Sequence, residues 1–333
     1  MIRPLNTLFE AGAKRSHVAH AARVWLSGRS LSEHADRDRQ RFPRAAGACL
    51  PAVDEELHGI ARVVDRDAAA DGSERRLIEL RDGRRVESVI LPRAALCVST
   101  QVGCAVGCQF CATGLLGLTR NLDTEEILAQ VVLAREQTPI RRVVFMGMGE
   151  PAHNLENVIE AIHDLGSYGA IGHKDLVFST VGDPDTFVRL AAGVVRPALA
   201  LSLHTMDADL RTALLPRAPK TDPAALLDAA LNYSDATGYP LQIQWTLLAG
   251  VNDSTDEVDA LIARLRNRRA VVDFIDYNPT EGFDHKRTSR EHTLTLTHQL
   301  HAAGVIAKLR SSSGQDARGG CGQLNASCGT SAG

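Results

Sequence analysis

The sequence predicts an α/β fold built on a parallel sheet, with about six strand–helix units in series. From about residue 95 onward, short runs of apolar residues alternate with longer stretches whose apolar residues recur at helical spacing. A helix between two such strands serves as a crossover, so the strands should run parallel, either in an open doubly wound sheet or in a partial barrel. In both arrangements ligands bind at the carboxyl ends of the strands.

Composition places the chain among ordinary globular proteins. Hydrophobic residues make up 44% and charged residues 23% of the 333 residues, which excludes disordered and collagen-like chains. The formal net charge is −3, so no overall basic field points to nucleic acid. The sequence contains no apolar stretch near the ~20 residues that span a bilayer, and its start lacks a signal-peptide core. We therefore expect a cytoplasmic protein with no membrane partner.

Residues 1–85 are predicted to form an N-terminal accessory region with a helical start and a small β-hairpin. Residues 1–48 hold nine Lys and Arg against four acids, an excess that suits either a solvated helical appendage or a surface that contacts phosphates. The apolar runs 77–80 and 86–91 flank the turn Asp82-Gly83, which is typical of a hairpin.

The predicted core spans residues 86–310. We expect strands over 143–146, 176–179, 198–203, 241–248, 271–277 and 305–309, and helices over 124–134, 155–165, 183–192, 223–235, 255–266 and 291–303. Asp123 or Thr124 should cap the first helix and Asp222 the fourth, because their side chains can accept from free N–H groups. Residues 311–333 are rich in Ser and Gly and predict a flexible C-terminal tail, which carries Cys321.

The cysteines point to a metal site rather than to disulfides. Seven occur, and four of them lie within fifteen residues, which is unlike a secreted disulfide framework. Three thiolates in a CxxxCxxC motif can hold three irons of a [4Fe–4S] cluster and leave the fourth iron open, and the motif here consists of Cys104, Cys108 and Cys111. A zinc site with Cys97 as fourth ligand is the alternative, although structural zinc sites usually use two separated pairs. Cys49 is expected to be a small buried hydrophobe and Cys328 an idle thiol.

Seven motifs extend this signal along the chain. In order they read CVSTQVGCAVGCQFCATGLLGLTRNL, FMGMGEPAHN, FSTVG, ALSLH, LLAGVNDS, YNP and SSGQDARGGCGQL. Together they closely resemble the RlmN/Cfr family of radical S-adenosylmethionine (SAM) RNA methyltransferases, over about residues 87–325, whereas the start of the chain, to about position 60, matches only loosely. The resemblance implies a partial (β/α)6 radical-SAM barrel, one [4Fe–4S] cluster with three cysteine ligands, and two molecules of SAM per turnover.

The resemblance also assigns residues that bind SAM. These lie at the ends of predicted strands, where a ligand is expected on independent grounds, and they are Gly149, Glu150, Ser179, Ser202, Leu203, His204 and Asn278. Taken alone, the turn GMGEP suits a tight β/α connection equally well, and His204 would more often be a structural histidine.

Two further cysteines and one carboxylate receive catalytic roles by the same resemblance. Cys321 would take a methyl group from one SAM, and a radical from a second SAM would remove hydrogen from that methyl group. The carbon radical would then add to adenine, Glu87 would take the proton from the attacked carbon, and Cys97 would release the product by forming a disulfide with Cys321. Without the resemblance, Cys97 would be a buried strand cysteine, Cys321 an incidental thiol and Glu87 an exposed strand carboxylate.

The family's substrates set the expected partners. RlmN-type enzymes methylate adenine C2 in 23S rRNA, at adenine 2503, and in some cases in tRNA, whereas Cfr-type enzymes methylate C8. We expect methylation of an RNA adenine, with C2 favoured and C8 as the alternative, by a monomer that receives electrons from a donor such as flavodoxin or ferredoxin. Two other functions stay open: a radical SAM enzyme that modifies a peptide or small molecule, and a non-catalytic, zinc-stabilised RNA-binding protein.

Overall fold

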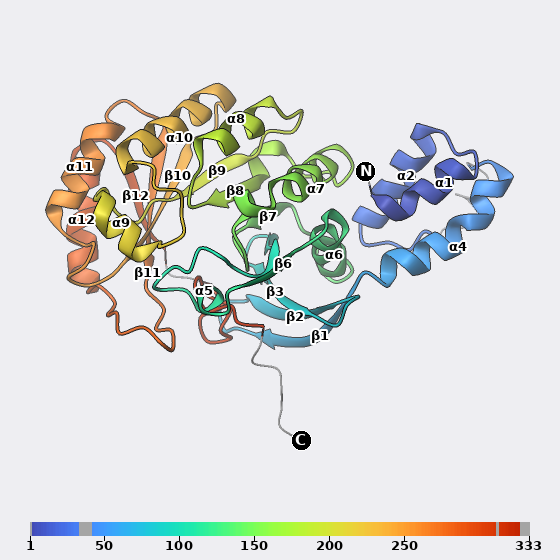
Figure 1. Cartoon of the computed structure of the whole chain (residues 1–333), viewed down its shortest axis with the longest axis horizontal. Helices are drawn as coiled ribbons and strands as arrows, with labels where there is room; N and C mark the ends of the chain where they lie inside the picture. Colours follow the sequence, from blue (N-terminus) through green and yellow to red (C-terminus); the bar gives the residue numbers. More distant parts are fainter. Residues whose placement is uncertain (1, 33–41, 311–312, 327–333) are drawn as a thin grey trace, which may run out of the picture.

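The computed structural model describes residues 2–32, 42–310 and 313–326 (Figure 1). One ten-stranded sheet runs through these residues in the order β1-β2-β3-β4-β7-β8-β9-β10-β11-β12. Its parallel part consists of β4 (Ala95–Cys97), β7 (Arg142–Phe145), β8 (Leu176–Thr180), β9 (Ala198–Ser202), β10 (Leu241–Leu247), β11 (Ala270–Asp276) and β12 (Ile306–Arg310). The α/β prediction with a parallel sheet is confirmed, and the arrangement is that of a partial barrel.

Each parallel strand before β12 is followed by a helix that packs on the outside of the sheet (Figure 1). These helices are α6 (Thr124–Arg135), α7 (Leu155–Ser167), α8 (Pro184–Ala192), α10 (Pro223–Thr237), α11 (Thr255–Leu265) and α12 (Arg290–Ala302). Asp123, rather than Thr124, caps α6 in a reciprocal capping box with Glu126, and Asp222 caps α10 by accepting from the N–H of Ala225 at 3.0 Å.

The side chains of β10 point alternately to the two faces of the sheet, one of which faces the apolar core and the other a cavity. Ile243, Trp245 and Leu247 point outward into the apolar core beneath the helices. Gln244 and Thr246 point the other way and line a cavity on the concave face. Because successive strand residues face opposite sides, a fully buried strand can supply both a packing surface and a polar site wall.

Antiparallel strands extend the sheet at its β4 edge. They are β1 (Ala61–Ala68), β2 (Glu74–Leu80) and β3 (Arg85–Leu91), and β2 and β3 form the hairpin that Asp82-Gly83 predicts. Some short elements were not predicted, among them the two-stranded sheet of β5 (Gln101–Gly103) and β6 (Leu118–Asn121), and the helices α5 (Ala112–Leu115) and α9 (Ala208–Leu214). Elements this short give periodicity too few residues in which to show.

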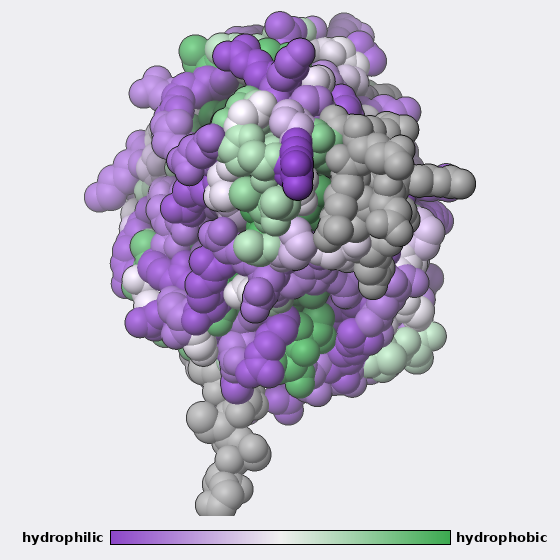
Figure 2. All heavy atoms as spheres, turned by 90° about the vertical axis from the view of Figure 1, so that its right-hand side faces the viewer, coloured by the Kyte–Doolittle hydropathy of each residue, from purple (hydrophilic) through white to green (hydrophobic). Residues whose placement is uncertain are grey.

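Before the first strand, the described part of the chain forms the helices α1 (Asn6–Glu10), α2 (Arg15–Leu26) and α4 (Arg44–His58), which stand beside α6 (Figure 1). Their buried side chains, among them Leu8 and Trp25, join the same apolar core as the barrel. Arg3 anchors them further, because its backbone N–H and guanidinium both donate to Glu125 of α6, at 2.7 and 2.9 Å. The face that these helices present is largely hydrophilic, with apolar areas between the polar ones (Figure 2).

Three remaining expectations from the sequence concern Cys49, Cys328 and the absence of a membrane-spanning helix. Cys49 is half-buried at the margin of the core, not fully buried as expected. Cys328 and part of the basic N-terminal segment, residues 33–41, lie outside the described residues. Within the described part of the chain, no helix is both long and apolar enough to cross a bilayer.

Candidate active site

A cavity opens on the concave face of the sheet, at the carboxyl ends of the parallel strands. It encloses about 830 Å³, including its open mouth. Nine of the residues singled out from the sequence for the cluster and for SAM, together with Cys321, line it: Cys104, Cys108, Cys111, Gly149, Glu150, Ser179, Ser202, His204, Asn278 and Cys321. The structure therefore brings together motifs that are far apart in the sequence, from the cysteine loop at Cys104 to the tail at Cys321.

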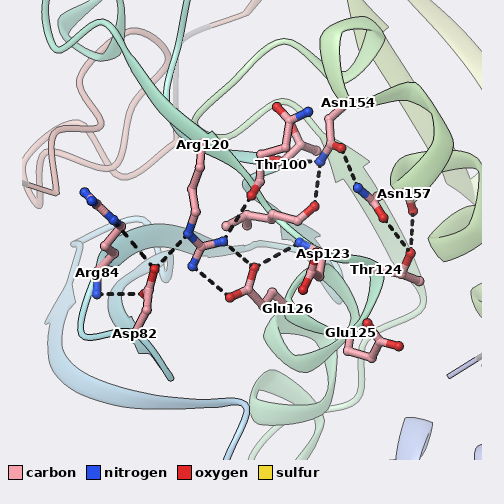
Figure 3. Close-up of polar contacts among 12 residues, drawn as sticks. Asp82, Arg84, Thr100, Arg120, Asp123, Thr124, Glu125, Glu126, Asn154 and Asn157 are labelled. Carbon is pink, nitrogen blue, oxygen red and sulfur yellow. Dashed lines mark hydrogen bonds and ion pairs between the residues drawn. The ribbon is translucent and has the colours of Figure 1, made fainter. Parts of the chain in front are cut away.

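The cysteine loop is held by a polar scaffold at its base (Figure 3). Asn154, at the end of the FMGMGEPAHN motif, donates to the carbonyls of Thr100 at 2.8 Å and Leu122 at 2.7 Å, which precede and follow the loop. Arg120 of β6 donates to Asp82 at 2.8 Å and to Glu126 of α6 at 2.7 Å. Both ends of the loop are thereby tied to the sheet and to α6, so its cysteines can lie in a fixed place.

The cysteine triplet has the chemistry that an iron–sulfur cluster needs. Burial, together with the charge of a neighbouring Cys111 thiolate, raises the pKa of Cys104 to about 12 and that of Cys108 well above its usual value. Three thiolates there are thus stable only against a cationic group. Among the described residues, no three His, Cys, Asp or Glu side chains lie close enough to share a single metal ion. Thiolates that each bind a different iron of one cluster must lie farther apart than the ligands of one zinc ion.

The GMGE turn after β7 shapes the adjoining wall. Gly149 has φ +102°, and a Cβ there would lie 2.7 Å from the side chain of Gln101, so only glycine allows this close approach. Gln101 in turn accepts from the N–H of Glu150 at 2.8 Å. The Glu150 carboxylate accepts from Val181 and Ala152, each at 3.0 Å. Burial nevertheless raises the pKa of Glu150 above its usual value, although these bonds oppose the shift.

His204 follows β9 with φ +66°, which turns its ring into the cavity. Its Nδ1 accepts from the N–H of Thr246 at 3.0 Å, so the remaining proton sits on Nε2. Burial, and then the charge of Arg211, lower the pKa of His204 to about 3, so the ring is neutral and acts as an N–H donor. Leu203 is different, because it is fully buried and does not line the cavity. Its backbone N–H donates to the carbonyl of Gln244 at 3.1 Å.

The tail residues 313–326 are anchored beside the cysteine loop. The N–H of Ala112 donates to the carbonyl of Gly322 at 2.7 Å, and Thr113 Oγ1 donates to the carbonyl of Leu324 at 2.8 Å. Asn278 Nδ2 donates to the carbonyl of Cys321 at 2.9 Å, so this predicted SAM-binding side chain holds the tail. Although Cys321 as a residue is exposed, protein atoms crowd its thiol and raise its pKa to about 11.

A second cavity of about 720 Å³ adjoins the first, and Cys321 lines both. Cys97, at the end of β4, lines the second cavity only. Burial raises the pKa of Cys97 to about 12, and the charge of a Cys321 thiolate raises it further, whereas the positive charge of Arg310 opposes the shift. Cys97 and Cys321, two of the four cysteines outside the CxxxCxxC motif, thus line the same cavity.

Glu87 lies outside both cavities and is not the exposed carboxylate that its position in the sequence suggested. It is 2% exposed, and its carboxylate accepts from Arg75 Nη1 at 2.5 Å and from the N–H of Asn325 at 2.6 Å. Burial raises the pKa of Glu87 above its usual value, while Arg75 opposes the shift. In this arrangement Glu87 anchors the tail.

Sequence reasoning missed several residues of the site. Gln101, Thr113 and Asn154 lie inside the quoted motifs and could have been found there as polar positions beside glycines and cysteines. Arg211 gave no such signal. It is 3% exposed, and it donates to the carbonyl of Val181 and, at 3.4 Å, to that of Ser202, which fixes two turns of the cavity wall.

Comparison with known proteins gives the family. The model of the radical SAM superfamily matches residues 98–284. The chain belongs to the radical SAM superfamily. Members carry a [4Fe–4S] cluster and SAM, and the cavity with its cysteine loop is where such groups fit. Together with the relatives described next, this match confirms the sequence resemblance to radical SAM RNA methyltransferases, and the protein is an enzyme rather than a non-catalytic zinc-stabilised binder.

Similar proteins extend the match over nearly the whole chain. A probable RNA methyltransferase of Aromatoleum aromaticum is 55% identical over 95% of this chain and 89% of its own length. Another of Pseudomonas paraeruginosa is 53% identical over 96% of this chain and 93% of its own length. The crystal structure of a radical SAM methyltransferase from Sphaerobacter thermophilus superposes with a TM-score of 0.78 at 33% identity, over 90% of this chain and 98% of that one. The similarity therefore includes most of the N-terminal region.

Proposed function

We propose that this enzyme is a radical SAM RNA methyltransferase that methylates an adenine through a methyl group carried on Cys321. The single observation that carries the proposal is the position of Cys321, which lines both the cavity with the cysteine triplet and the cavity with Cys97. RNA as the substrate is supported by two relatives, 55% and 53% identical, that are named probable RNA methyltransferases. We infer C2 of adenine 2503 in 23S rRNA as the target, with tRNA as a second substrate.

Cys104, Cys108 and Cys111 would ligate one [4Fe–4S] cluster. When bound, such a cluster would supply the electron for the reductive cleavage of SAM, and the methyl group on Cys321 would be the hydrogen donor. The amino-acid end of SAM would lie next to the cysteine loop, where Glu150 accepts from a charged amine. His204 would donate through Nε2, because its Nδ1 is already occupied by Thr246.

Cys321 would act first as a nucleophile. Its thiol loses a proton, its sulfur bonds to the methyl carbon of SAM, and S-adenosylhomocysteine leaves. After hydrogen removal the same carbon would bond to adenine, which links RNA to the protein, and the electron supplied at the start would return to the cluster. Glu87 would take the proton from the attacked carbon, and for this it must give up its bond to Asn325, which requires the tail to shift.

Cys97 would release the product. Its sulfur attacks the sulfur of Cys321, the bond between Cys321 and the methylene carbon breaks, and that carbon takes a proton to become the methyl group of the product. The resulting disulfide must be reduced before the next turnover. The N-terminal accessory region, residues 1–85, would contact RNA, and the tail, residues 311–333, would carry the methyl group in and out of the first cavity.

The Cys97→Ala variant tests this function. The holoenzyme, reconstituted without oxygen, is incubated with SAM, a reductant and a 23S rRNA fragment. We expect a protein–RNA adduct that survives denaturing electrophoresis, whereas Cys49→Ala, which changes a cysteine outside both cavities, should turn over normally. Nucleoside analysis of the product then distinguishes C2 from C8. A Cys97→Ala enzyme that turns over like the wild type would contradict the proposal, and an adduct with a peptide instead of RNA would favour the other substrate class.

A further inference from the structure

Arg310 is the one positively charged side chain among the described residues that line either cavity. It ends β12, pairs in register with Ile275 of β11, and lines the second cavity together with Cys97 and Cys321. No motif that predicted the site drew attention to it. Three cysteines line this cavity, and one of them, Cys111, belongs to the proposed cluster. Arg310 is therefore the cation that would respond to a thiolate on Cys97 or Cys321.

The guanidinium of Arg310 is only loosely paired in this structure. Its nearest carboxylate is Asp273 Oδ2, 4.0 Å from Nη1, and no hydrogen bond from Arg310 to another described residue is formed. The side chain is 39% exposed, so its donors face the cavity and solvent. A guanidinium has five N–H donors in a planar fork, and one loose ion pair leaves most of them available to an anion.

Arg310 is not the only group that interacts with the Asp273 carboxylate. Gln244 Nε2 donates to the same Oδ2 at 3.3 Å, and the charges of Lys308 and Arg142 also act on this carboxylate. Arg310 can therefore leave Asp273 for a second anion without stranding a buried carboxylate. This is the arrangement expected of a cation that moves between a resting partner and a transient one.

We propose that Arg310 is a positioning residue that holds the Cys97 thiolate for its attack on Cys321. The inference rests on the proposed function, in which Cys97 resolves the adduct. In this step the thiolate of Cys97 reacts with the protein–RNA adduct and one proton. The products are the disulfide between Cys97 and Cys321 and the methylated adenine. The electron pair of the Cys97 sulfur forms the S–S bond, and the pair of the breaking C–S bond goes to carbon, which takes the proton. The negative charge that Arg310 balances disappears in the step, so Arg310 returns to Asp273.

The groups that face Cys97 are few. Cys321 approaches from the tail and Arg310 from β12, and both act on the charge of the Cys97 sulfur. Cys111 lines the same cavity as Cys97, and the proposed cluster would bind its thiolate. On β3 and β2, the carboxylate of Glu87 pairs with Arg75, whose guanidinium also lies 3.7 Å from Asp65 and from Asp67. Of the groups named here, Arg310 is the positive charge that lines the cavity with Cys97, and its nearest carboxylate is that of Asp273 at 4.0 Å.

The test measures resolution of the adduct in single turnover, with holoenzyme, SAM and the 23S rRNA fragment. Arg310→Met should accumulate adduct and resolve it more slowly near neutral pH, by about tenfold for each unit by which loss of the positive charge raises the pKa of Cys97. Raising the pH should restore the rate, and Arg310→Lys should restore most of it at neutral pH. Lys308→Met is the matched control, since Lys308 lies two residues away on β12 but lines neither cavity, and it should resolve normally.

The outcomes separate the two proposals. An unmethylated Cys321 in the wild type would overturn the proposed function, and with it this inference. If Cys321 is methylated but Arg310→Met resolves the adduct at the wild-type rate at every pH, only the role of Arg310 is overturned, and the proposed function stands. If thermal unfolding shows that Arg310→Met does not fold, Arg310→Gln takes its place in the test. A rate of adduct resolution that falls equally in Arg310→Lys and Arg310→Gln at all pH values would also contradict a charge-based role.

Discussion

Removing one hydroxyl from Thr113 should release the tail. Thr113 is 3% exposed, and its Oγ1 donates to the carbonyl of Leu324 at 2.8 Å. Thr113→Val keeps the shape of the side chain but leaves that carbonyl without its donor. An unpaired buried polar group costs about 1–3 kcal/mol. At RT of about 0.59 kcal/mol, the undocked fraction of the tail should rise roughly five- to 150-fold.

Limited proteolysis measures this fraction. Trypsin can cut after Arg318, which is exposed, but only when the surrounding tail leaves its site, so the rate follows the population of the open form. Release of the peptide that contains Cys321 should accelerate by the factor above. Thr295→Val, which removes a hydroxyl from the exposed face of α12, serves as the control and should leave the rate unchanged. Equal rates in wild type and Thr113→Val would refute the docking contact.

Three further predictions follow from the same geometry. Gly322→Ala should also free the tail, because Gly322 has φ +80° and a Cβ there would lie 2.8 Å from the carbonyl oxygen of Phe110. The left-handed backbone would cost alanine roughly 1–2 kcal/mol, so trypsin should release the tail peptide at least about fivefold faster. The pKa of His204 is about 3 in the folded protein and 6.5 in the unfolded chain, so it contributes stability above pH 6.5 that is lost as the pH falls toward 3. Between pH 7 and pH 5, the free energy of unfolding of the apo protein, measured with denaturant, should therefore fall by about 2 kcal/mol less in His204→Asn than in the wild type. Cys321→Ala should retain the brown cluster but give no methylated RNA, and normal methylation by this variant would exclude Cys321 as carrier.

The parallel core was readable from the sequence because its strands are buried on both faces. Runs such as Val143–Phe145 and Leu176–Phe178 are continuously apolar, and the helices between them carry clear caps such as Asp222. The predicted core helices and strands therefore lie within two residues of the observed ones. The chemistry of the cysteine loop was readable for another reason, since few functions need three thiols at this spacing.

The rest depends on contacts that no local pattern encodes. The sheet of β5 and β6 pairs three residues with a largely exposed strand, so neither partner shows alternation. Burial of Glu87 arises because Arg75 and the backbone of Asn325, far away in the sequence, meet its carboxylate. The Ser- and Gly-rich tail suggested mobility, yet its backbone carbonyls at Cys321, Gly322 and Leu324 are held by donors from other elements. Backbone acceptors are the same in every residue, so sequence does not reveal them.

Mass spectrometry of the tail peptide that contains Cys321 tests the central claim most directly. The protein is produced with iron and SAM available, purified without oxygen, and checked for an intact cluster by its absorbance. Cys321 should carry one methyl group in place of its thiol hydrogen, whereas Cys97 and Cys49 should not. An unmodified Cys321 in protein with an intact cluster would contradict the methyl-carrier role, and with it the proposed route to methylated RNA.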